Sequence, residues 1–221
     1  VGYSDSQVTA VDLSLASLAY AQRQSSELGV DNLNYLQADI LDLHRLDKEF
    51  DMIQSSGVLH HMADPIVGWK VLTDLLRSGG LMKIGLYSEL ARTSIVKIRK
   101  DIATLAIGSS EGEIRKFRQS LINSKDEDYQ RLSLYKDFFS LSELRDLIFH
   151  VQEHRFSLPQ IKNCLDELGL KFCGFESKVA NSNFREFHGK EADVYDLTLW
   201  NRYEESNPLA FIGMYQFWCQ K

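Results

Sequence analysis

The sequence predicts an α/β fold with a mostly parallel sheet. Two observations lead to this prediction. Short apolar runs of strand length alternate with segments of helical spacing over the first 87 residues, and two of these runs end directly at an aspartate. Strands that alternate with helices pair in parallel, because each helix returns the chain to the same edge of the sheet. With 221 residues, 44% of them apolar, the chain can bury one sizeable core or a core plus an inserted helical subdomain.

The first predicted strand covers residues 8–12 and ends in the carboxylate of Asp12, just before Ser14, a residue type favoured at helix N-termini. An acid at the carboxyl end of a strand can accept hydrogen bonds from both hydroxyls of a ribose. Its negative charge could equally stabilise the first turn of the next helix. Taken alone, Asp12 leaves both interpretations open.

The same patterns predict the other elements of the first unit, residues 1–87. Helices are expected over 15–28 and 66–76, and strands over 33–38, 50–55 and 81–87. The strand over 33–38 ends at Asp39, so a second acid follows a second strand. Gly79 and Gly80 are expected to end the second helix.

Beyond residue 87 the pattern changes. Residues 88–157 show helical spacing over 88–122 and 141–151, with a charged loop at 123–128, which predicts a helical insertion or cap over the sheet. Strand and helix patterns alternate again in residues 158–221. Helices are expected over 158–168 and 192–205, and strands over 170–175 and 213–219. We expect the last two strands to form an antiparallel edge that completes the same sheet.

The formal net charge of −6 argues against a nucleic-acid-binding surface. A local basic cluster, Lys97, Arg99 and Lys100, is expected to be a solvated helix face. The sequence has no apolar run long enough to cross a bilayer, and residues 1–30 lack the charged-then-apolar pattern of a signal peptide. These features favour a cytoplasmic enzyme with neither a membrane nor a nucleic acid as partner.

A five-residue pattern indicates a different chemistry. The run from His150 to His154 fits the H-x-x-E-H motif of inverted zinc peptidases. On a helix, the two histidines could bind Zn²⁺ while Glu153 activates water. Pro159 predicts a loop soon afterwards and the sequence specifies no third ligand, so a zinc peptidase is the weaker alternative. Three cysteines are too few and too widely spaced for a zinc cage or a disulfide framework, and we expect reduced core residues at Cys164, Cys173 and Cys219.

Four segments of the first unit share the order and spacing of motifs in one enzyme family. They are residues 8–14, 37–40, 56–62 and 76–82. Over residues 8–87 the chain resembles the class I S-adenosylmethionine-dependent methyltransferases, and its final strands do so loosely. Residues 58–69 and 87–92 look, more narrowly, like methyltransferase domains that sometimes follow tetratricopeptide repeats. The resemblance implies a Rossmann-like sheet, with the helical insertion after the family's fifth strand and an antiparallel C-terminal strand.

The resemblance also implies S-adenosylmethionine as cofactor and assigns residues to it. Asp12 would hold the ribose hydroxyls, and Leu13 would lie beside the adenine. Asp39 would accept from the adenine amino group, and Ile40 would pack on the ring. The segment that passes the methionine portion of the cofactor would contribute Ser56, Gly57 and His61.

Methyl transfer from a sulfonium is an in-line displacement, so the protein mainly aligns donor and acceptor and excludes water. A general base helps where the acceptor is a hydroxyl or an amine, and His60 lies near the predicted methyl group. Tyr87 and Glu89 follow the fifth family strand, at the edge where ligands bind in open α/β sheets. The predicted catalytic residues are His60, Tyr87, Glu89 and His154, and the predicted acceptor-binding residues are Arg92, His150 and Arg155. No metal is expected in this function.

Each of these residues also has a structural explanation. One histidine of the pair at 60 and 61 could simply donate to the backbone. Glu89 and Arg92 are three residues apart and could form an exposed helical ion pair. His150, His154 and Arg155 could form a polar cluster. Four aromatic residues could line a pocket for a small molecule or peptide, although aromatics at helical spacing are more often core: Phe138, Phe139, Phe149 and Trp200.

The sequence departs from the family in one respect. The family's first strand and its glycine-rich loop are expected just upstream of Val1, and no other segment of the sequence replaces them. In the family that strand separates the strands predicted here at 8–12 and 50–55. We expect these two strands to pair directly, or a second copy of the chain to fill the gap, because unpaired buried backbone is costly. The predicted function is methyl transfer to a small molecule or peptide, with a catalytically inactive binding module as the alternative.

Overall fold

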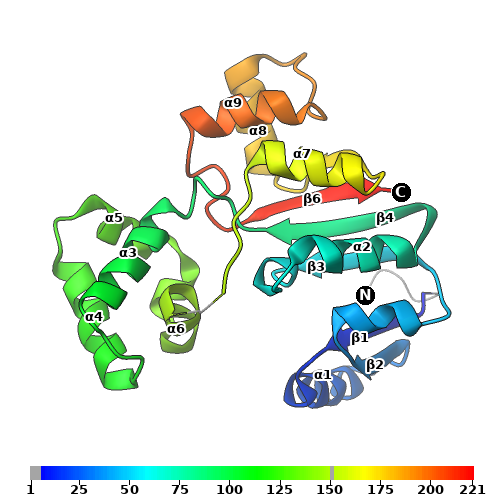
Figure 1. Cartoon of the computed structure of the whole chain (residues 1–221), viewed down its shortest axis with the longest axis horizontal. Coiled ribbons are helices and arrows are strands. Elements are labelled where there is room, and N and C mark those ends of the chain that lie inside the picture. The colour runs from blue at the N-terminus through cyan, green and yellow to red at the C-terminus, as the bar shows by residue number, and fades with distance from the viewer. Residues whose placement is uncertain (1–5, 150–151) are drawn as a thin grey trace.

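The computed structural model describes residues 6–149 and 152–221, which form an α/β part and a separate lobe of helices (Figure 1). Strands β1 (Val8–Asp12) and β2 (Leu33–Gln37) pair in parallel as a two-stranded sheet. A second sheet has the strand order β3-β4-β6-β5. Its strands are β3 (Phe50–Ser56), β4 (Leu76–Leu86), β5 (Lys171–Phe175) and β6 (Tyr215–Gln220). Every predicted strand is therefore present.

The sheet pairing corrects two predictions. β3 and β4 are parallel, but β6 is antiparallel to both β4 and β5, so the second sheet is mixed rather than mostly parallel. Direct pairing of β1 with β3 was wrong, because the two strands belong to different sheets. The antiparallel C-terminal strand is confirmed, but it lies inside the sheet between β4 and β5. Tyr215, Phe217 and Cys219 on alternate positions of β6 are fully buried, as expected for an interior strand.

Local signals explain the helices of the first unit. The side chain of Ser14 accepts a hydrogen bond from Ser17 N at 3.2 Å and caps α1 (Leu15–Glu27). Asp64 caps α2 (Pro65–Leu75) in the same way, and proline stands at the first position of this helix. Two 3₁₀ helices, η1 (Ile40–Arg45) and η2 (Leu59–His61), follow β2 and β3. β4 begins directly after α2, earlier than predicted, because buried Leu76 already pairs with Phe50.

The helical lobe follows β4 and has its own hydrophobic core. Its α-helices are α3 (Thr93–Thr104), α4 (Glu111–Asn123), α5 (Glu127–Arg131) and α6 (Leu141–Phe149), with short 3₁₀ turns η3 (Leu132–Leu134) and η4 (Lys136–Phe139). A capping box at Ser110 starts α4, so the helix expected over 88–122 is two helices. The basic cluster is only partly a solvated face: Lys97 pairs with Asp126 and Asp128, and the Arg99 side chain is only 18% exposed.

The chain then returns to the sheet through α7 (Leu158–Glu167), which contacts β5 and lies on the side of the sheet that faces the viewer in Figure 1. Helix α8 (Lys178–His188) was not predicted, because Ala180 and Phe184 are the buried residues of this largely polar helix. α9 (Leu197–Ser206) packs against α7 and α8. No helix in the described ranges is both long and apolar enough to span a membrane.

The aromatic residues and cysteines singled out in the sequence differ in how deeply they are buried. Trp200 is core and stacks on Phe184 with 4.1 Å between ring centroids, and Phe138 is buried in the helical lobe. Phe139 is 73% exposed, and Phe149 packs at the edge of the lobe's core. All three cysteines are free thiols, and two of them, Cys164 and Cys219, are buried.

Candidate functional site

The two acids predicted to bind cofactor stand at strand ends and are engaged only locally. Asp12 is exposed, and its Oδ1 accepts from Ser14 N at 2.7 Å. Asp39 caps η1, and its Oδ1 accepts from Leu41 N at 2.9 Å. Ala38 N donates to the Asp12 carbonyl at 3.3 Å, so the ends of β1 and β2 adjoin. Both acids therefore stabilise a turn, and the Asp12 carboxylate remains exposed toward solvent.

Glycines lie at the ends of β3 and β4. Gly57 has a φ of +77°, a conformation that L side chains rarely adopt. A Cβ at Gly85 would lie 2.8 Å from Met214 Sδ and 2.9 Å from Ser56 Cα, so only glycine fits there. Met214, in the loop before β6, packs over this corner and was not predicted. The backbone at Gly57 suits close approach of a ligand. The assignment of Ser56 and Gly57 to the cofactor stays a prediction.

An aromatic cluster follows this corner. The rings of His60 and Tyr87 stack with 3.8 Å between centroids, and His61 meets both rings edge-on. His60 is fully buried, and neither of its ring nitrogens makes a hydrogen bond of good geometry to the described residues. Burial, and then the neighbouring His61, lower the pKa of His60 to about 3. His60 is thus a neutral packing residue behind Tyr87, which corrects its prediction as a base that meets the acceptor.

An extended segment, residues 152–156, runs along this cluster, and we call it the strap. His154 N donates to the His60 carbonyl at 2.8 Å, and Phe156 N donates to the Tyr87 carbonyl at 2.9 Å. His61 Nδ1 bonds the carbonyl oxygen of Gln152 at 3.1 Å. The zinc-peptidase alternative required a helix at His154, and these backbone bonds instead hold the strap extended over the described residues 152–156. His150 lies outside the described residues.

The strap buries one carboxylate among arginines. The side chain of Glu153 is 1% exposed and accepts two bonds from Arg92, at 2.9 and 2.6 Å, and one from Arg99 at 2.8 Å. Arg155 Nη1 lies 3.6 Å away. Burial alone would raise the pKa of Glu153, but the bonds and charges of Arg92 and Arg99 outweigh it and lower the pKa.

The environment of Glu153 argues against the zinc-peptidase interpretation. A carboxylate whose two oxygens are held by guanidinium groups is not placed to activate a metal-bound water. No group of three or more potential ligands among His, Cys, Asp and Glu that could hold a metal ion occurs in the described part of the chain. Arg92 is also not part of an exposed pair with Glu89, because the Arg92 side chain is 2% exposed and paired with Glu153.

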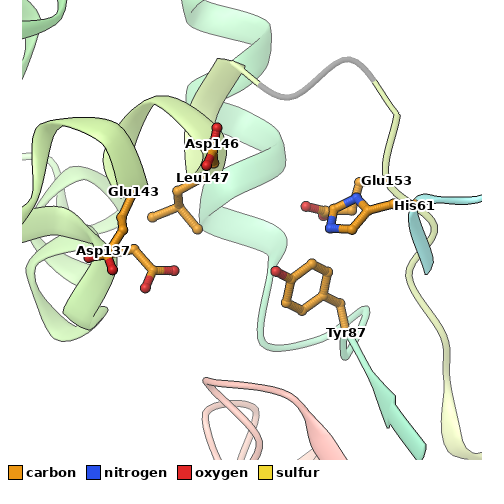
Figure 2. Close-up of a pocket in the computed structure, with 7 residues that line it drawn as sticks. All are labelled: His61, Tyr87, Asp137, Glu143, Asp146, Leu147 and Glu153. Carbon is orange, nitrogen blue, oxygen red and sulfur yellow. The ribbon is translucent and has the colours of Figure 1, made fainter. Parts of the chain in front are cut away.

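A cavity of about 360 Å³ opens between this cluster and the helical lobe. Figure 2 shows its two walls: His61, Tyr87 and Glu153 on one side, and residues of η4 and α6 on the other. The second wall consists of Asp137, Glu143, Asp146 and Leu147. One wall is therefore aromatic and the other carries three carboxylates.

The cavity assembles part of the predicted site. Among the described residues, Tyr87 and His61 line it, whereas Glu89 and Arg155 do not. The side chain of His154 likewise lies outside the lining, and only its backbone bond ties it to the cluster. The sequence analysis did not identify the acidic wall. Glu143 and Asp146 are three residues apart and so share a face of α6, which is a usable signal, but nothing local shows that this face meets Tyr87.

Comparisons with known proteins agree with this architecture. Residues 2–84 match the family model described as a methyltransferase domain. An uncharacterized protein of Synechococcus sp. (strain ATCC 27144 / PCC 6301 / SAUG 1402/1) is 29% identical over 213 residues, which cover 89% of this chain and 50% of that protein. The chain thus spans about half the length of this curated relative.

Solved structures share the fold. PKMT2 from Rickettsia typhi superposes with a TM-score of 0.71 at 16% identity, over 99% of this chain and 44% of that chain. Its complex with AdoHcy gives a TM-score of 0.65 at 18% identity, over the same shares. An S-adenosylmethionine-dependent methyltransferase from Mesorhizobium loti gives 0.52 at 17% identity, over 98% of this chain and 81% of that one. The family match covers residues 2–84, and the solved structures, at 16–18% identity, show that the chain shares the fold of these proteins.

Proposed function

We propose that the chain transfers a methyl group from S-adenosylmethionine to an amine of a small molecule or peptide bound in the cavity. The observation that carries this proposal is the acidic wall: Asp137, Glu143 and Asp146 face Tyr87 and His61 across the cavity. Carboxylates concentrate cations and repel anionic acceptors. The fourth acid, Glu153, is neutralised by its arginines and adds little to this field.

The residues at the strand ends fit the cofactor. Asp12 and Asp39 offer carboxylates for the ribose and adenine, while Gly57 leaves backbone open to close approach. S-adenosylmethionine, when bound, supplies an electrophilic methyl group and leaves as S-adenosylhomocysteine. The complex of the Rickettsia typhi protein with AdoHcy supports this half of the proposal.

The residues of the cavity would prepare the acceptor. An amine enters as an ammonium ion, attracted by the acidic wall, and must lose a proton before its lone pair can form the new N–C bond. Histidine is the side chain that ordinarily exchanges protons near neutral pH, and His61 lines the cavity with its ring oriented by the Gln152 carbonyl. We assign proton removal to His61, and orientation of the nitrogen to the Tyr87 hydroxyl.

A set of acceptors of equal chain length tests the proposal. The chain is incubated with methyl-tritiated S-adenosylmethionine and hexylamine, hexanol or hexanoate, and the label in each organic product is counted. We expect labelled hexylamine and no label in the other two. Label in the alcohol or the acid instead would overturn the amine assignment. Binding of S-adenosylhomocysteine without any labelled acceptor would favour the inactive binding module.

A further inference from the structure

We propose that Arg92 is a positioning residue that holds the Tyr87 hydroxyl toward the cavity, and that Glu153 of the strap holds Arg92 in turn. The inference rests on the proposed function, since it concerns how Tyr87 acts there. It assigns a purpose to a buried ion cluster that cofactor binding does not need.

The ring of Tyr87 is held from both faces. The centroid of the His60 ring lies 3.8 Å from the Tyr87 centroid, and Arg92 Cζ lies 3.7 Å from it. Two groups so close to one centroid would overlap if they shared a face, and a position in the ring plane would collide with the ring carbons. His60 and Arg92 therefore enclose the phenol ring, with a stacking contact on one face and a cation–π contact on the other.

The guanidinium of Arg92 is itself fixed. Its Nε and Nη2 donate to the two oxygens of Glu153, a bidentate arrangement that sets both distance and orientation. Arg99 donates to the same carboxylate at 2.8 Å and to the Leu147 carbonyl at 3.1 and 2.7 Å. Because Leu147 belongs to the acidic wall, Arg99 links Glu153 on one wall of the cavity to the other wall.

Stability alone does not explain this cluster. A buried ion pair gives little net stability over well-packed apolar side chains of similar volume, because desolvation offsets the attraction. What a bidentate pair does supply is a defined orientation. Glu153 orients Arg92, and Arg92 in turn covers the ring of Tyr87, whose side chain lines the cavity.

The activity test is a double-mutant cycle with Arg92→Lys and Tyr87→Phe, assayed by transfer of label to hexylamine. Lysine keeps the charge and loses the planar fork. We expect Arg92→Lys to lower kcat about ten-fold with KM changed less than about two-fold, and to cause no further loss in the Tyr87→Phe background, because coupled residues are not additive. Tyr129→Phe is the matched control: it removes a hydroxyl bonded to Asp101 at 2.9 Å, and the Tyr129 ring also has a cation, Lys97, at 5.6 Å.

A second experiment, by fluorine NMR spectroscopy, tests the position of Tyr87 without any acceptor. The chain is labelled with 3-fluorotyrosine, and the fluorine resonance of residue 87 is assigned as the one lost in Tyr87→Phe. Arg92→Lys should shift and broaden this resonance and leave that of Tyr129 in place. Because lysine preserves the charge, this variant is expected to stay folded, and the Tyr129 resonance reports whether it has.

The outcomes separate the two proposals. An unmoved Tyr87 resonance, or a kcat loss that is additive with Tyr87→Phe, would overturn the role of Arg92. Full activity of Tyr87→Phe would overturn the role of the Tyr87 hydroxyl in both proposals. If hexylamine is not labelled, the amine proposal fails and the fluorine spectrum alone decides whether Arg92 holds Tyr87.

Discussion

The proposed site has a cofactor end at Asp12 and an acceptor end at Glu153, and the two ends hold their acids in opposite ways. At the cofactor end, Asp12 is exposed and bonds a backbone amide two residues away. At the acceptor end, Glu153 is buried and bonds arginines 61 and 54 residues away in sequence. An exposed acid can exchange water for a ligand at little cost to the fold, whereas a buried acid with arginine partners is part of the fold. We therefore expect substitution of Asp12 to change binding, and substitution of Glu153 to change stability and geometry.

The largest effect is expected for Glu153→Gln. Removing this charge leaves Arg92 and Arg99 without their counterion, and breaking a buried pair from one side costs about 3 kcal/mol or more. Urea denaturation should show the midpoint fall accordingly. Glu27→Gln, which breaks an exposed pair with Arg23, should leave the midpoint in place. A Glu153→Gln midpoint close to the wild-type value would remove the contrast between the two ends.

Next comes Asp12→Ala. If the carboxylate holds ribose hydroxyls, its loss should weaken binding of S-adenosylhomocysteine about 10- to 100-fold by calorimetry, the range for a hydrogen bond to a charged group. The unfolding midpoint should change little, because the side chain is exposed. Asp31→Ala, at an exposed acid before β2, serves as the control. Equal affinities for the two variants would argue that Asp12 only stabilises its turn.

A smaller effect is expected on the acidic wall. Glu143→Gln combined with Asp146→Asn should raise the KM for hexylamine roughly five-fold, because exposed charges attract the ammonium ion only through a screened field. The KM difference from wild type should shrink as salt is added. Glu111→Gln in α4, away from the cavity, should behave like wild type. A KM for hexylamine that changes neither with the substitution nor with salt would contradict the electrostatic argument for an amine acceptor.

The smallest effect concerns a second buried carboxylate, Glu204, which accepts from Ser88 Oγ at 2.6 Å and from the Tyr215 hydroxyl at 2.7 Å. Burial raises its pKa, whereas arginines lower that of Glu153. The stabilising effect of Glu204 is complete below the ordinary carboxyl pKa and is lost as pH rises through the raised folded value; that of Glu153 is lost as pH falls. Urea titrations across pH should show Glu204→Gln removing a decline in stability toward higher pH. An unchanged slope would mean that Glu204 keeps an ordinary pKa.

Local signals explain what could be predicted. The cap at Ser14, the acid at the end of β1 and the strands of the first unit depend on neighbours in sequence, and the structure has them, although β4 begins earlier than predicted. Sheet pairing depends on distant partners, so the separation of β1 from β3 could not be inferred from either strand.

The acceptor end also depends on contacts between residues that are distant in sequence. The pattern from His150 to His154 fits a zinc motif in sequence. The partners of Glu153, however, are Arg92 at the N-cap of α3 and Arg99 within α3, and the strap is extended. Glu143 and Asp146 are an acidic helix face like many others until the fold places Tyr87 opposite. Residue types at this end were visible in the sequence, but their roles were set by tertiary contacts.

The most direct test is a crystal structure of the chain with S-adenosylhomocysteine. We expect the ribose hydroxyls on the Asp12 carboxylate and the sulfur turned toward the cavity between Tyr87 and the acidic wall. A ligand bound away from Asp12, or one whose sulfur faces away from Tyr87, would contradict the proposal that this cavity is where the methyl group is transferred.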